Sequence, residues 1–195
     1  GGVVGYSWGT IENCSVSGSV SGTNCVGGVV GSQKVGSIIG CSSSAIVKGT
    51  RYVGGVAGEK WGTMTACYAT GNVTLEFGSH NNLSGGGVVG LSGGNRVLAC
   101  YAIGNVTSTG SSTGNVHIGG LLGDSYTEVT ACYWKNNQEQ GIGRNQHSTA
   151  PEATKVDGAT VKWQAAVDGM NTALQNASSE WRYELKGALP TLRKQ

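Results

Sequence analysis

The sequence is poor in proline, phenylalanine and charge. Of its 195 residues only 2 are Pro and 1 is Phe, charged residues make up 12%, and the formal net charge is +2. So little Pro excludes collagen. A near-neutral chain lacks the basic surface of nucleic-acid-binding proteins, and no apolar run approaches the length of a membrane span. Because 38% of the residues are hydrophobic, ordinary disorder is excluded as well.

Glycine is abundant, and its distribution divides the chain. Residues 1–150 hold 32 of the 35 Gly, whereas the last 45 residues hold three. Charged residues become denser in the later part, which also holds both Pro residues. This shift predicts two regions, residues 1–150 and residues 151–195.

The first region contains five copies of a repeat. The pattern Gly-Gly-apolar-apolar-Gly starts at residues 1, 27, 54, 86 and 119. A Cys follows each start by 13 or 14 residues, and these are Cys14, Cys41, Cys67, Cys100 and Cys132. Alternating small and apolar residues after the Cys predict a strand. A unit of 26–33 residues with so thin an apolar face needs stacked neighbours to bury a core.

We therefore predict an all-β fold for residues 1–150, a parallel β-helix (β-solenoid) of about five coils. Each repeat offers two or three short strands. The longer Ser-, Gly-, Asn- and Thr-rich stretches, residues 74–85 and 107–118, are expected to be loops at one edge.

Residues 151–195 are predicted to form a small α/β cap over the last coil. The spacing of the apolar residues predicts a helix with one apolar face, which carries Trp163, Ala166, Val167, Met170 and Leu174. Asp157 or Thr160 is the expected N-cap. Trp181, Tyr183 and Leu185 then alternate as in a strand. Because residue 1 is already the first Gly of a repeat, we expect this chain to be a fragment of a longer one.

The repeats resemble a known family. The GG-[VL]-[VAL]-G start, the aliphatic residue three before the Cys and the C-[YS]-A-x-G-x-V strand are similar to GLUG-motif repeats over residues 1–134. The resemblance implies a β-helical region of a bacterial surface or secreted protein, and hence an extracellular or cell-surface location. It implies no catalytic residues.

The cysteines allow two interpretations. In-register side chains lie ~4.8 Å apart, beyond the ~3.5–4.5 Å between Cβ atoms that a relaxed disulfide needs, which favours buried free thiols. If a disulfide forms, Cys25, outside the ladder, is expected to be one half. No C-x-x-C occurs and His80, His117 and His147 are scattered, so we expect neither a metal site nor a cofactor.

Little in the sequence indicates catalysis. Ser7 and Ser92 lie in G-x-S-x-G patterns, but both fall at the same place in the repeat and no helix is expected to follow. Asp124 and Glu128 are four residues apart and are expected to face solvent. We therefore predict that the chain is not an enzyme.

Two sets of aromatic residues are candidates for binding. Tyr68, Tyr101 and Tyr133 each follow a Cys and are expected to form an outward ladder. Trp8, Trp61 and Tyr126 share another position, seven residues after a repeat start, in alternate repeats. Such side chains stack on sugar rings or anchor proteins, so a host or matrix protein or a glycan is the expected partner. Packing that only shields the sheet is the alternative.

Two functions remain open. The first is a structural or adhesin-like module that forms a rigid stalk or a binding surface. The second is an accessory β-helical region of a secreted protease or carbohydrate-active enzyme whose catalytic domain lies outside this chain. These residues do not discriminate between the two.

Overall fold

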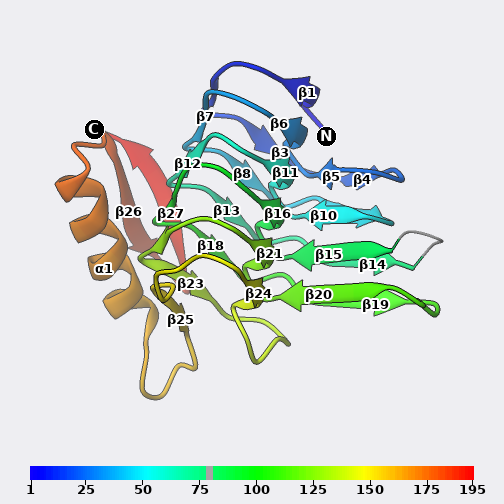
Figure 1. Cartoon of the computed structure of the whole chain (residues 1–195). Helices are drawn as coiled ribbons and strands as arrows, with labels where there is room; N and C mark the ends of the chain where they lie inside the picture. The colour runs from blue at the N-terminus through cyan, green and yellow to red at the C-terminus, as the bar shows by residue number, and fades with distance from the viewer. Residues whose placement is uncertain (78–80) are drawn as a thin grey trace.

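The structure is a computed structural model that describes residues 1–77 and 81–195. In these residues the protein is mostly β, with many parallel strands in stacked sheets, one helix and a C-terminal hairpin (Figure 1). Strands from successive repeats pair side by side, which is consistent with a β-helix. Within the described ranges, no helix is long and apolar enough to cross a membrane.

Three of the stacked sheets enclose the larger core. Sheet A contains β1 (Val4–Ser7), β6 (Val30–Gln33), β11 (Ala57–Lys60), β16 (Val89–Ser92), β21 (Leu122–Ser125) and β24 (Ile142–Asn145). Sheet B contains β2 (Ile11–Glu12), β7 (Ser37–Ile39), β12 (Thr63–Thr65), β17 (Val97–Leu98) and β22 (Val129–Thr130). Sheet C contains β3 (Ser15–Val16), β8 (Ser42–Ser43), β13 (Tyr68–Ala69), β18 (Tyr101–Ala102), β23 (Cys132–Trp134) and β25 (Ala153–Lys155).

The other two stacked sheets form an arm on one side of the molecule (Figure 1). Sheet D contains β4 (Ser19–Ser21), β9 (Ile46–Gly49), β14 (Val73–Glu76) and β19 (Val106–Thr109). Sheet E contains β5 (Val26–Gly27), β10 (Tyr52–Gly54), β15 (Asn82–Gly86) and β20 (Asn115–Gly119). The arm has its own apolar interior, which includes Val47, Val53, Val73 and Leu83.

Each full turn of the chain passes through sheets E, A, B, C and D, so a turn carries more strands than the two or three predicted per repeat. The Cys-led alternation reads as one strand, but the structure divides it between sheets C and D, as in β13 and β14. The strands of sheet E precede or overlap the Gly-Gly starts and were not predicted separately. The stretches 74–85 and 107–118 are not simply loops. They lengthen the arm, where Leu75 pairs with Ser108 and Leu83 with Val116. Residues 78–80 of the first stretch lie outside the described residues.

A left-handed residue stands before every Cys of the ladder and turns the chain from sheet B into sheet C. Positive φ angles occur at Asn13 (54°), Gly40 (60°), Ala66 (53°), Ala99 (52°) and Ala131 (50°). This region of φ is costly for Ala, so the stacked corner must hold it in place. The third Gly of the repeat has a different role, since a Cβ on Gly58 would lie 2.4 Å from the Val26 nitrogen. Because Gly58 has no Cβ, sheet A can lie directly against sheet E.

The C-terminal segment contains α1 (Trp163–Asn176), β26 (Trp181–Lys186) and β27 (Leu189–Lys194), and the two strands form an antiparallel hairpin. All five residues predicted on the apolar face of the helix are buried. The predicted N-cap is wrong, because the helix starts after Lys162. Asp157 instead accepts backbone hydrogen bonds from Ala159, Thr160 and Val161, and so orders the preceding turn.

This segment was predicted over the last coil, but it lies along the flank of the stack (Figure 1). Its apolar contacts include Ile39, Ala66, Leu98 and Tyr133, which come from four different repeats. The hairpin reaches the first repeat, where Lys194 Nζ lies 2.9 Å from Glu12 Oε1. The segment therefore bridges the stacked strands from the side.

Candidate functional site

The first predicted ladder, Tyr68, Tyr101 and Tyr133, is in register on sheet C. The rings of Tyr68 and Tyr101 are stacked, with centroids 4.9 Å apart and an interplanar angle of 1°. The ladder is not an open surface, however, because Tyr101 is fully buried beneath Trp163 and Tyr183. Its hydroxyl donates a hydrogen bond to the Pro190 carbonyl (2.5 Å). The prediction of an exposed ladder is therefore wrong at Tyr101, where packing accounts for the aromatic side chain.

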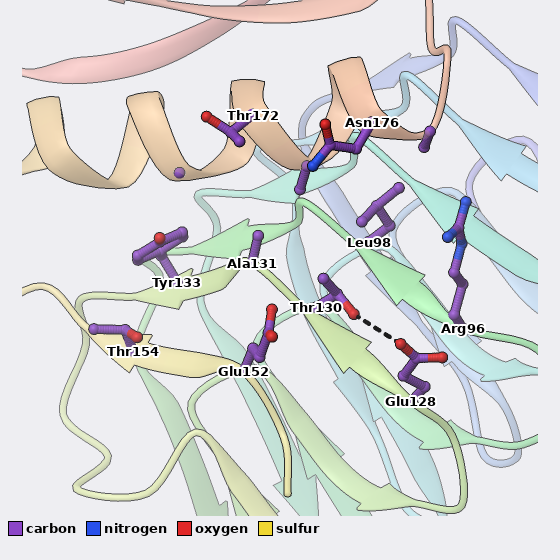
Figure 2. A pocket seen from close by; sticks show the side chains of 13 residues that line it. Arg96, Leu98, Glu128, Thr130, Ala131, Tyr133, Glu152, Thr154, Thr172 and Asn176 are labelled. Atoms are coloured by element: carbon purple, nitrogen blue, oxygen red, sulfur yellow. Dashed lines mark hydrogen bonds between the residues drawn. The ribbon is translucent and has the colours of Figure 1, made fainter. Parts of the chain in front are cut away.

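A pocket of about 540 Å³ lies between α1 and the flank of sheets B and C (Figure 2). Its apolar wall includes Leu98, Ala131 and Tyr133, and its outer rim carries Arg96, Glu128, Glu152, Thr172 and Asn176. The Thr130 hydroxyl donates to Glu128 Oε1 (3.3 Å), as the dashed line in Figure 2 shows.

The pocket follows from the way α1 rests on Tyr133. A Cβ on Gly169 would lie 2.3 Å from the Tyr133 hydroxyl oxygen, so the helix touches the sheet here through a residue without a side chain. Burial raises the pKa of Tyr133. The charged groups of the rim are exposed, and a shallow amphipathic cleft of this kind can hold a peptide side chain or a small apolar group.

The second predicted set, Trp8, Trp61 and Tyr126, lies along sheet A and is exposed, with 67%, 42% and 45% of the surface of each residue accessible. Backbone hydrogen bonds continue the ladder of sheet A through these positions, for example from Trp61 N to Gln33 O (2.9 Å) and from Tyr126 N to Ser92 O (2.8 Å). The successive residues of this row are Trp8, Lys34, Trp61, Gly93, Tyr126 and Gln146. The three aromatic residues therefore lie at one register position, in alternate strands of sheet A.

A buried carboxylate lies next to Trp61. Glu59 accepts hydrogen bonds from Lys34 Nζ (2.6 Å), Ser32 Oγ (2.7 Å) and Trp61 Nε1 (2.8 Å). The side chain of Glu59 is 10% exposed. Burial alone would raise the pKa of this carboxyl group, but the hydrogen bonds from Lys34, Trp61 and Ser32 outweigh burial and lower it. Glu59 therefore remains ionised and holds the Trp61 ring in place.

A second buried carboxylate lies beside Tyr126. Asp124 was expected in solvent, but its side chain is only 5% exposed and forms an ion pair with Arg144. Arg144 also lies 3.4 Å from the Tyr126 hydroxyl. The hydrogen bond to Asp124 raises the pKa of Arg144. The expected neighbour of Asp124, Glu128, is exposed and lies at the rim of the flank pocket.

Glu59 and Asp124 occupy one register position. The corresponding residues in sheet A are Tyr6, Ser32, Glu59, Leu91, Asp124 and Arg144. In the five repeats this is the fifth residue after the start. Comparison of equal offsets in the sequence could therefore have brought Glu59 and Asp124 together, but their cationic partners come from other positions.

The next residue along is polar in every strand of sheet A, and in the four inner strands it is buried. Gln33, Lys60, Ser92 and Ser125 are all fully buried. Lys60 Nζ donates to the Gly62 carbonyl (3.0 Å) and to the Asn95 carbonyl. Burial lowers the pKa of Lys60 from 10.5 to about 7. Sequence reasoning missed this row, because a Lys followed by Trp-Gly reads as a surface turn.

The Cys ladder lies inside sheets A, B and C, and all six cysteines of the chain are free. Cys41, Cys67, Cys100 and Cys132 are buried. Each of these four donates a weak hydrogen bond to the carbonyl two residues earlier, at 3.3 to 3.4 Å. Cys25 is also unbridged, and its Sγ lies 3.8 Å from Glu59 Oε2.

The serines of the G-x-S-x-G patterns lie in the same row of sheet A, but only Ser92 is buried. Ser92 is fully buried and shares a hydrogen bond with the Thr127 hydroxyl (2.9 Å), whereas Ser7 bonds within its own turn to Gly9. His117 lies in β20 and His147 follows β24, and His80 is outside the described residues. In the part of the chain that the structure describes, no three His, Cys, Asp or Glu side chains are grouped so that they could hold a metal ion.

The fold is that of a repeat protein with stacked parallel sheets and a polar, partly aromatic outer face on sheet A. Its first repeat, residues 1–21, matches the family model of the GLUG motif. The similarity to GLUG-motif repeats, expected from the residue pattern, is thereby confirmed. No curated protein and no solved structure matches the chain significantly.

Proposed function

We propose that this chain is a non-catalytic structural or adhesin-like module of a bacterial cell-surface or secreted protein. Five coils, one for each repeat, form a rigid unit, and residues 151–195 act as a cover along its flank. The observation that carries the proposal is the contact of the C-terminal hairpin with the first repeat at Glu12, after the helix has packed on later repeats. Because the C-terminal segment contacts several repeats along the flank, it resists the separation of neighbouring strands under mechanical load.

Two features support a surface role. Apart from the buried polar row of sheet A, the interior is filled by apolar and thiol side chains in register, which suits a rod of stacked repeats. The outer face of sheet A exposes Trp8, Trp61 and Tyr126. Exposed aromatic side chains of this size are typical of binding surfaces.

Protease shaving of intact cells that produce the protein tests this proposal. Trypsin is applied to washed cells, and the released peptides are identified by mass spectrometry. We expect peptides from exposed sites, such as the bond after Lys186 at the hairpin turn, from intact cells or from the culture medium. A cytoplasmic marker protein is the control for lysis. Recovery of the chain only after lysis would contradict the proposed location.

A further inference from the structure

The exposed aromatic residues of sheet A recur with a fixed period. Along the row of Trp8, Lys34, Trp61, Gly93, Tyr126 and Gln146, the aromatic positions alternate with Lys34 and Gly93. We call this row, together with the row of Tyr6, Ser32, Glu59, Leu91, Asp124 and Arg144, the aromatic strip. Neighbouring strands lie ~4.8 Å apart, so Trp8, Trp61 and Tyr126 recur about every 9.6 Å along the stack. This period is close to the length of one disaccharide unit in an extended β-1,4-linked polysaccharide.

Each aromatic side chain is held by a neighbour. The Trp8 and Tyr6 rings meet edge to face, with centroids 5.8 Å apart. Trp61 donates through Nε1 to Glu59, and its ring covers Gly93, where a Cβ would lie 2.6 Å from the ring. Tyr126 is held by Arg144. Restraint of this kind lowers the entropy lost on binding, so the rings form a preorganised platform.

Charge on the strip is balanced. The two cations, Lys34 and Arg144, each pair with one buried carboxylate, Glu59 and Asp124. The side chains of Lys34 and Arg144 remain 29% and 35% exposed, so they present donors beside the rings. Since the formal charges of the strip cancel, its polar groups suit sugar hydroxyls better than the carboxylates of an acidic polymer.

From these observations we infer that the aromatic strip binds a neutral, extended β-1,4-linked polysaccharide that runs along the stacking direction. Trp8, Trp61 and Tyr126 contact successive alternate sugar rings, Lys34 donates to hydroxyls between Trp8 and Trp61, and Arg144 donates to hydroxyls beside Tyr126. Alternate sugars of such a chain present the same face, which is why aromatic residues in alternate repeats are sufficient. This inference rests on the proposed function, since such a polymer is met outside the cell.

Isothermal titration calorimetry with cellohexaose and chitohexaose tests the inference on the intact chain. We expect one of these β-1,4-linked probes to bind, and maltohexaose, which has α-1,4 linkages and a helical shape, to bind much more weakly. Trp61→Ala is expected to weaken binding about ten-fold, the effect of losing one central aromatic contact. Ile46→Ser, which removes an exposed apolar side chain on sheet D, is the matched control and is expected to bind like the wild type.

A second variant tests the spacing itself. The double variant Trp61→Gly, Gly93→Trp keeps the composition but moves the aromatic residue by one strand, so we expect it to bind as weakly as Trp61→Ala. Circular dichroism confirms that each variant is folded before titration. The inference is overturned if neither β-linked probe binds the wild type, if maltohexaose binds equally well, or if the shifted variant binds like the wild type. Binding of a protein ligand to the strip instead would also overturn it.

The two proposals fail separately. Shaving of intact cells reports the location of the protein and does not depend on the strip, whereas calorimetry uses the purified chain and does not depend on location. If the protein is found on the cell surface but does not bind the β-linked probes, the proposed surface module stands and the proposed polysaccharide binding is rejected.

Discussion

The indole ring of Trp181 lies directly against the backbone of Gly40, so that a Cβ on Gly40 would stand 2.3 Å from Trp181 Cζ2. Gly40 is also left-handed, with a φ of 60°. At the equivalent corners of later repeats the same backbone is adopted by Ala66 and Ala99. The close approach of Trp181, more than the backbone angle, therefore explains the Gly at this corner.

Gly40→Ala is expected to displace Trp181 and loosen the C-terminal hairpin from the second repeat. We expect the free energy of unfolding to fall by about 1–3 kcal/mol, the usual cost of overpacking a fitted contact. Urea unfolding followed by Trp fluorescence measures the loss. Gly9→Ala is the control, because nothing lies within 4 Å of a Cβ there. Equal stability of the two variants would contradict the importance of this contact.

Tyr101→Ser tests the structural role of the buried tyrosine. Because Tyr101 is fully buried and its ring contacts Trp163 and Tyr183, we expect the free energy of unfolding to fall by about 3–5 kcal/mol. Tyr101→Phe keeps the ring and loses only the hydrogen bond to Pro190, so a loss of about 1 kcal/mol is expected. Tyr6→Ser, at a 53% exposed position, is the stability control. A Tyr101→Ser protein as stable as the control would mean that the segment does not pack here.

The repeat pattern was sufficient to predict the stacked parallel strands and the apolar face of α1, because both depend on local periodicity. It could not predict that Trp181 reaches Gly40, since this contact joins two regions that have no shared pattern. For the same reason Tyr101 was expected to be exposed. The alternation after each Cys predicts that the Tyr101 side chain points away from the core, but it does not predict that the C-terminal segment covers this side chain.

The charged part of the aromatic strip shows a second limit. Glu59 and Asp124 share an offset in the repeat, but their cationic partners do not. Lys34 comes from the repeat before Glu59, whereas Arg144 comes from the segment after the fifth repeat. Ion pairs between strands require the register, which only the structure supplies. Trp61 and Tyr126 were recognisable because both lie seven residues after a repeat start.

Thiol accessibility tests the Cys ladder. Burial raises the pKa of Cys67, Cys100 and Cys132, and burial together with nearby Glu59 raises the pKa of Cys25 to about 11. At pH 8 we therefore expect a disulfide reagent to label the native protein slowly, with half-buried Cys14 reacting first. Cys14→Ser should remove this first phase. In denaturant without reductant all six thiols should react at once, and a smaller number would reveal a disulfide.

Lys60 makes stability depend on pH. Its pKa falls from 10.5 in the unfolded chain to about 7 in the folded protein because the ammonium group is buried. Between these values Lys60 binds more protons in the unfolded state, so the contribution of Lys60 to the free energy of unfolding should rise as the pH rises from about 7 to 10.5. The buried thiols, whose pKa values are raised, act in the opposite direction at the alkaline end of this range. Below about pH 7 the cost of burying the charged ammonium group is fully present, and it is on the order of a few kcal/mol.

Lys60→Met removes the titrating group while keeping the length of the side chain. Urea unfolding at a series of pH values should show that the free energy of unfolding of the wild type gains on that of this variant between pH 7 and 10.5. Lys48→Met, at an exposed position of β9, should keep the slope of the wild type. If Lys60→Met and the wild type have the same slope, Lys60 does not lose its proton on folding, and water must reach the inward row of sheet A.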